Sequence, residues 1–111
     1  MYQKFLNFKK ELEKRYGVCL MSFEEFEKFG RTSQPKKVFW HLKHYGKITN
    51  KECHEIYGIR HAPAVIRDLK DNLKYYSDMR IGVDTIDKSE IDRWGNKTPF
   101  VEYILVGLGV A

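Results

Sequence analysis

Apolar residues at the start of the chain recur at helical spacing. Between residues 2 and 16, aromatic and leucine side chains return every three to four positions, and Gly17 follows as a helix stop. Ser22, with Glu25 three residues later, forms a capping box that begins a second, shorter helix, which ends before Gly30. The pattern predicts two amphipathic helices in succession.

A polar stretch over residues 31–35 ends in Pro35, a residue favoured in the first turn of a helix. We therefore expect residues 1–30 to form an N-terminal helical extension that serves packing or dimerisation, and residues 31–111 to form the main domain. The first helical stripe of the main domain consists of Val38, Phe39, Leu42 and Tyr45, and it ends at Gly46.

Two further helices follow closely. Thr49, with Glu52 three residues later, is a second capping box, and it begins a short helix that Gly58 ends. The pattern predicts a third helix from near His61 to about Asn72. Its inward-facing positions are Ala62, Val65, Ile66, Leu69 and Leu73.

The period of the pattern changes to two near the C-terminus. Residues 81–85 alternate between apolar and other side chains, Gly95-Asn96 signals a tight turn, and residues 100–106 are rich in β-branched and aromatic types. This predicts a long β-hairpin. The stretch 87–92 either continues the first strand or forms an irregular loop, and the pattern leaves both alternatives open.

A winged helix-turn-helix domain has this order of elements: three helices, with a sharp turn before the last one, and then a hairpin. The segments GKITNKE (residues 46–52) and YGIRHAPAVIRDLK (residues 57–70) resemble the small winged helix-turn-helix domains of bacteriophage and prophage proteins. The resemblance implies an α+β, mainly helical fold with three helices plus a β-hairpin wing, and it leaves residues 1–30 unexplained. The sequence departs from the family at His61 and Val65 and in its acidic wing.

Positive charge is concentrated in the middle of the chain. The formal net charge is +5, but residues 31–80 carry eleven Lys and Arg against five Asp and Glu, whereas residues 81–111 carry three against five. Such a concentration favours a polyanion, which releases counterions on binding. A solvated basic face without a partner would have the same composition.

Helical spacing indicates which residues would face DNA. With the apolar positions of the third helix turned inward, its outer side presents Arg67 and the small Ala64, and Arg60 precedes them. An arginine can hold both major-groove acceptors of guanine, and an alanine can touch a thymine methyl group. The start of the second helix and the wing would add phosphate contacts. The complete set of expected DNA contacts is Thr49, Asn50, Lys51, Arg60, His61, Pro63, Ala64, Arg67, Lys74, Lys88, Arg93 and Lys97.

A structural interpretation competes at both arginines. Arg67 can pair with Asp71 one helical turn later, and Arg60 can be a solvated turn residue. Asp68 and Asp71 also oppose DNA binding, because carboxylates repel phosphates.

Neither metal binding nor catalysis is indicated. His41, His44, Cys53 and His54 lack the separated pairs of a structural zinc site. Cys53 and His54 are neighbours on a helix and point about 100° apart, so they do not form a nucleophile and base pair. We expect no enzyme activity, no cofactor, and reduced rather than disulfide-bonded cysteines at positions 19 and 53.

These observations predict a sequence-specific duplex DNA-binding protein, a phage- or prophage-type transcriptional regulator that acts by site occupancy. A homodimer through residues 2–29 would supply the second recognition helix that operators usually need. The acidic hairpin motivates an alternative, an anti-CRISPR-like protein that blocks a host nuclease and autoregulates its operon. No apolar run is long enough to cross a membrane and no signal peptide is seen, so we expect a cytoplasmic location, in the host cell if the protein is phage-encoded.

Overall fold

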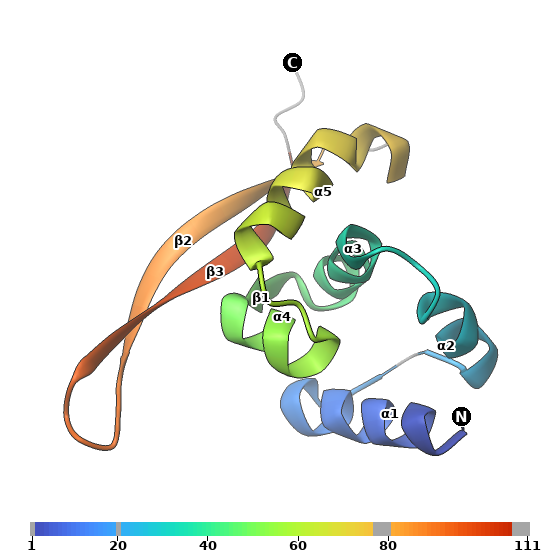
Figure 1. The fold of residues 1–111 in the computed structure, drawn as a ribbon, viewed down its shortest axis with the longest axis horizontal. Helices are drawn as coiled ribbons and strands as arrows, with labels where there is room; N and C mark the ends of the chain where they lie inside the picture. Colours follow the sequence, from blue (N-terminus) through green and yellow to red (C-terminus); the bar gives the residue numbers. More distant parts are fainter. Residues whose placement is uncertain (1, 20, 77–80, 108–111) are drawn as a thin grey trace. The chain divides into compact units, whose positions relative to one another are not determined.

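The computed structural model describes residues 2–19, 21–76 and 81–107, and for residues 74–76 and 81 it describes the backbone alone. Five helices and a three-stranded antiparallel sheet lie within these residues, which confirms the expected α+β class (Figure 1). The chain divides into two compact units, Met1–Ser33 and Gln34–Ala111. None of the helices in the described ranges is long and apolar enough to cross a membrane.

The unit Met1–Ser33 is a pair of helices joined through aromatic side chains. Helix α1 (Tyr2–Tyr16) and helix α2 (Phe23–Phe29) lie as the apolar pattern predicted. The Phe26 ring lies 5.6 Å from the ring of Phe5 and 5.3 Å from that of Phe8, a range in which tilted aromatic pairs attract one another. Ser22 Oγ accepts a hydrogen bond from the Glu25 N–H and caps α2.

Three helices build most of the second unit: α3 (Gln34–Tyr45), α4 (Asn50–Tyr57) and α5 (Ala62–Tyr76). A hydrogen bond of 2.7 Å between His41 Nδ1 and the Tyr57 hydroxyl links α3 to α4. Helix α5 extends beyond the predicted end because no glycine or proline interrupts residues 72–76. The core comprises Val38, Phe39, Leu42, Ile48, Cys53, Ile59, Ala62, Val65, Ile66, Leu69, Leu73, Val83 and Tyr103.

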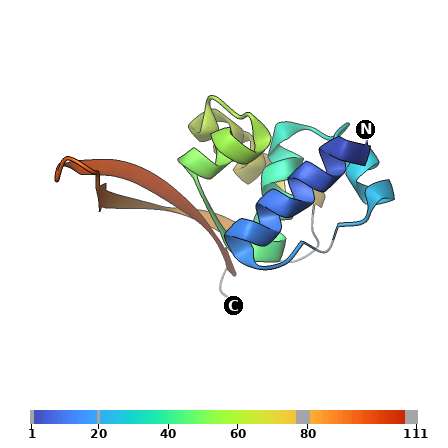
Figure 2. The same cartoon turned by 90° about the horizontal axis from the view of Figure 1, so that it is seen from below.

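The sheet has the strand order β1-β3-β2. Strands β2 (Ile81–Ile91) and β3 (Lys97–Gly107) form the predicted hairpin, and β2 runs as regular strand through the stretch 87–91 that the sequence left undecided. Strand β1 (Lys47–Thr49) pairs antiparallel with β3. The far end of the hairpin projects away from α4 and α5 (Figures 1 and 2).

Candidate nucleic-acid interface

Helices α4 and α5 are joined by a tight, internally supported turn. The capping box predicted at the start of α4 is present: Thr49 Oγ1 accepts from the Glu52 N–H at 3.1 Å, and Glu52 Oε1 accepts from the Thr49 N–H at 2.9 Å. Gly58 ends α4 with φ of +69°, in the left-handed region that glycine adopts without strain. Ile59, 1% exposed, then anchors the turn in the core. The start of α5 is thereby fixed.

Helix α5 separates its apolar and charged side chains. Val65, Ile66 and Leu69 are buried, whereas Arg67 and Lys70 are exposed, as is Arg60 before the helix. Among the described residues, Arg60, Arg67 and Lys70 form no ion pair, and none joins Arg67 to Asp71. The basic groups on this outer side are therefore available to an external anion.

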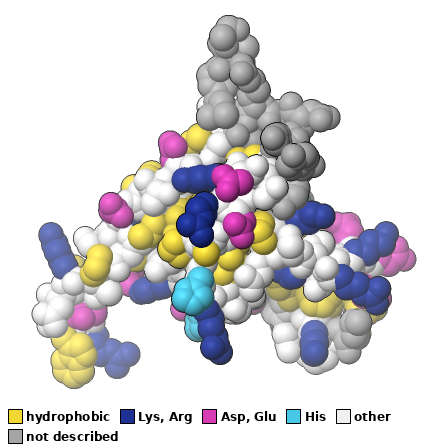
Figure 3. Space-filling model, turned by 45° about the horizontal axis from the view of Figure 1, so that its top comes forward, with side chains coloured by type: hydrophobic (Ala, Val, Ile, Leu, Met, Phe, Trp, Pro, Cys, Tyr) yellow, Lys and Arg dark blue, Asp and Glu magenta, His cyan; other side chains and the backbone are white. Residues whose placement is uncertain are grey.

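An open groove of about 340 Å³ runs between α5 and the sheet. The register places Thr85 opposite Tyr103 and Asp87 opposite Val101, so alternate residues of both strands face α5. Figure 3 shows basic and acidic side chains beside apolar surface at the centre of this face. The groove is lined by Pro63, Ile66, Arg67, Lys70, Asp71, Thr85, Val101 and Tyr103.

A second hollow, of about 300 Å³, lies at the start of α5. It is lined by His61, Pro63, Ala64 and Arg67. Pro63 and Arg67 also line the larger groove, so the two hollows meet along one side of the helix. Four residues that the sequence singled out for DNA contact are thereby brought together.

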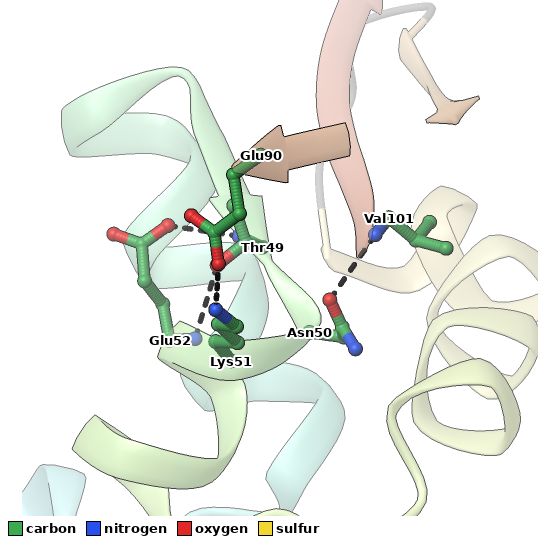
Figure 4. Close-up of polar contacts among 6 residues, drawn as sticks. All are labelled: Thr49, Asn50, Lys51, Glu52, Glu90 and Val101. Atoms are coloured by element: carbon green, nitrogen blue, oxygen red, sulfur yellow. Dashed lines mark hydrogen bonds and ion pairs between the residues drawn. The ribbon is translucent and has the colours of Figure 1, made fainter. Parts of the chain in front are cut away.

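The first turn of α4 holds the hairpin. Asn50 Oδ1 accepts a hydrogen bond of 3.1 Å from the Val101 N–H of β3, and the Lys51 ammonium group pairs with the Glu90 carboxylate of β2 (Figure 4). Together with the cap residue Thr49, these are the residues predicted to contact phosphate at this helix start. In the structure, their side chains have partners inside the protein.

The three hairpin residues that were predicted to contact DNA differ in their surroundings. Lys88 pairs at 3.0 Å with Glu102, whose carboxylate is almost completely buried. Arg93 and Lys97 are exposed at the end of the hairpin. The side chain of Lys74, also predicted to contact DNA, lies outside the described residues.

Two buried groups near the site, the Cys53 thiol and the Tyr103 hydroxyl, keep their protons at neutral pH. Burial raises the pKa of the Cys53 thiol to about 12, and the neighbouring Glu52 carboxylate adds to the rise. Burial also raises the pKa of Tyr103. A protonated, inaccessible thiol is a poor nucleophile and a poor metal ligand. In the part of the chain that the structure describes, no three His, Cys, Asp or Glu side chains gather where they could hold a metal ion.

Sequence reasoning missed one residue of α5 and the whole sheet side of the groove. Lys70 was not selected, and neither were Thr85, Val101 and Tyr103. Lys70 follows Arg67 by three positions, a spacing that places both on one side of a helix, so helical geometry could have found it. The strand residues require the register of β2 against β3, which no local pattern supplies.

A comparison of the chain with protein-family models, curated proteins and solved structures finds no match.

Proposed function

We propose that the unit Gln34–Ala111 is a winged helix-turn-helix domain that binds duplex DNA, with α5 in the major groove and the β2–β3 hairpin as the wing. One observation carries the proposal. Helix α5 buries one side in the core, and its opposite side offers Arg60, Arg67 and Lys70, which form no ion pair among the described residues. A helix held in this way fits a major groove about 12 Å wide.

The outer side of α5 supplies two kinds of contact. Arg67, next to the small Ala64, reaches guanine N7 and O6, and Ala64 lets the helix approach the base edges. Lys70, along the groove shared with the sheet, neutralises a phosphate of the adjoining backbone. Asp71 also lines this groove, and it disfavours phosphate close to its carboxylate. The DNA backbone should therefore pass close to Lys70 and away from the Asp71 carboxylate.

The hairpin offers fewer available carboxylates to a basic partner than its composition indicates. The Glu90 carboxylate is paired with Lys51, and one Asp92 oxygen accepts hydrogen bonds from the Trp94 and Asn96 N–H groups. The acidic hairpin motivated the alternative, a host-nuclease inhibitor, and two of its carboxylates, those of Glu90 and Asp92, are thus engaged within the protein. We favour DNA binding, with regulation of transcription by site occupancy as the biological role.

Anisotropy of a fluorescently labelled, mixed-sequence duplex, titrated at several salt concentrations, tests the proposal. The Arg60→Ala/Arg67→Ala variant should bind at least about tenfold more weakly than the unchanged protein, because it loses two positive charges that face the DNA, and a tenfold loss corresponds to about 1.4 kcal/mol. Its dependence of log affinity on log salt should also be shallower. Selection from a random duplex pool would then identify the preferred sequence.

The matched control is Lys10→Ala/Lys14→Ala, which removes two exposed positive charges from α1. It should lose little affinity if α5 makes the contact. Equal loss in the two double variants would contradict the placement of α5 and indicate a general charge effect. Absence of duplex binding, with tight binding to a host nuclease, would favour the alternative function.

A further inference from the structure

The loop that closes the hairpin carries Trp94 with its side chain 80% exposed. Ile91, at the end of β2, is also exposed, and Arg93 and Lys97 lie on either side of the tryptophan in sequence. Figure 3 shows an apolar side chain beside Lys or Arg side chains at the left-hand end of the molecule, which is this end of the hairpin. The loop therefore combines one large flat ring with two cations.

Hydrogen bonds hold this loop in one shape. Asp92 Oδ1 accepts from the Trp94 N–H and the Asn96 N–H, both at 2.9 Å. The Gly95 N–H donates to the Asp92 carbonyl at 3.0 Å, and the Asp92 N–H donates to the Asn96 carbonyl at 2.9 Å. Gly95, at φ of +82°, supplies the left-handed residue that such a short hairpin loop requires. Little backbone freedom is left for a ligand to remove, so binding through Trp94 has a low entropy cost.

The charge of the loop suits an anionic partner. Arg93 and Lys97 form no ion pair among the described residues. The one carboxylate of the loop, that of Asp92, is stabilised by the two N–H groups that it accepts from. Further back along the hairpin, Glu90 and Glu102 are paired with lysines. Positive charge therefore dominates around the exposed ring.

We propose that Trp94 is a base-stacking wedge: its indole ring inserts at a base-pair step in the minor groove beside the α5 site, while Arg93 and Lys97 hold the flanking phosphates. This rests on the proposed DNA binding by α5. Wedges of this kind partly unstack a step and bend the duplex. A ring that stacks on bases without reading their edges would add affinity with little sequence preference.

The dimensions of the tip favour nucleic acid over a protein partner. A stable protein interface buries about 800 Å² on each side around a core of several apolar residues. Here the described apolar side chains are Trp94 and Ile91, interrupted by charged residues. Strands of eleven residues reach about 35 Å. The wing is thus long enough to extend past a helix seated in the adjacent groove.

The test compares Trp94→Ala and Trp94→Phe in the full chain, using the same labelled duplex. Trp94→Ala should weaken binding about five- to 150-fold, the range for loss of one stacked aromatic, and leave the salt slope unchanged. Trp94→Phe, which keeps a flat ring, should retain most of the affinity. Arg93→Ala should instead lower the salt slope by about one, as expected for loss of a phosphate contact.

Two fluorescence measurements report the insertion of the Trp94 ring directly, in addition to the change in affinity. In a Trp40→Phe background Trp94 is the single tryptophan, and its emission should be quenched by the duplex. A 2-aminopurine placed at successive steps of the duplex should change its emission at the step where the ring inserts. Ile91→Ala, a nearby exposed apolar residue, is the control and should change neither signal. Circular dichroism should show every variant folded, because the loop hydrogen bonds do not involve the indole ring.

The outcomes separate this inference from the proposed function. Unchanged affinity in Trp94→Ala, with unquenched Trp94 emission and no change in 2-aminopurine emission at any step, would overturn the wedge while leaving α5 binding intact. Absence of duplex binding by the unchanged protein would overturn both. Quenching by a host nuclease but not by the duplex would assign the tip to a protein partner and also overturn the wedge.

Discussion

Cys53 lies at the centre of the second unit with none of its surface exposed. Burial holds its thiol in the neutral form and raises its pKa from 9.0 to about 12. The native state therefore keeps a proton that the unfolded chain releases above pH 9. By linkage, the free energy of unfolding is unaffected by this group at lower pH and falls as pH rises from about 9 to about 12.

The effect of the Cys53 thiol on stability should be measurable at alkaline pH. Over that interval the unchanged protein should lose up to roughly 1.4 kcal/mol of stability per pH unit from this group, a loss that Cys53→Ala should not show. Denaturant titrations at successive pH values measure both slopes, and lysine titrations common to the two proteins cancel. The Tyr103 titration cancels only in part, because the Cys53 charge contributes to raising the pKa of Tyr103. Identical slopes would mean that the thiol is not protected by burial.

Gly58 is a second position where one residue decides local structure. Its φ of +69° strains any side chain with a Cβ, although the space around it is open. Gly58→Ala should therefore lower the free energy of unfolding by about 1 kcal/mol through the backbone alone. Gly30→Ala is the matched control, because Gly30 has φ of −59° and a Cβ there makes ordinary contacts. Thermal melts that rank the two variants equally would refute the backbone explanation.

At the scale of elements, the first turn of α4 connects the helices to the wing. Its Asn50 and Lys51 contact β3 and β2, and the Lys51–Glu90 pair is half exposed on both sides. Exposed ion pairs contribute about 0–1 kcal/mol, so the pair contributes more to the orientation of the hairpin than to stability.

Asn50→Ala should therefore loosen the contact between α4 and β3 while leaving the unit folded. The expected loss of stability is about 1 kcal/mol, the value of one hydrogen bond. Hydrogen exchange should detect faster exchange of the Val101 amide, which loses its acceptor, with unchanged protection in α5. Lys47→Ala, at an exposed position in β1, is the control. Unchanged exchange at Val101 in the Asn50 variant would show that β-sheet pairing alone holds the hairpin.

Local patterns in the sequence predicted the helices. They could not predict the pairing of strands that lie far apart in the sequence. Stripes and capping boxes placed α1 and α4, because each depends on residues three or four positions apart. Strand β1 has three residues, too few for a periodic signal, and its partner lies more than fifty residues further along. Lys51 was likewise predicted to contact phosphate, because its ion pair with Glu90, 39 residues further along, forms only in the folded chain. The groove along α5 needed this same strand register.

At the scale of the whole molecule, the expected homodimer through residues 2–29 can be measured directly. Two recognition helices on one operator would strengthen binding that a single short helix supplies weakly. Light scattering should give twice the chain mass of 13.2 kDa at high protein concentration. Val18→Asp, which charges an exposed apolar position outside both N-terminal helices, should shift the mass to that of the monomer. A monomer at every concentration would exclude this assembly.

Strand β2 lies at the margin of the sheet, and within the described residues its outer side pairs with no strand. Eleven residues of open backbone could template stacking of one chain upon another, the route to fibrils. Asp84 and Asp87 are exposed along this strand, and their mutual repulsion between neighbouring molecules opposes such stacking. The negative charge of the hairpin thus has a use in keeping the protein dispersed when its concentration is high.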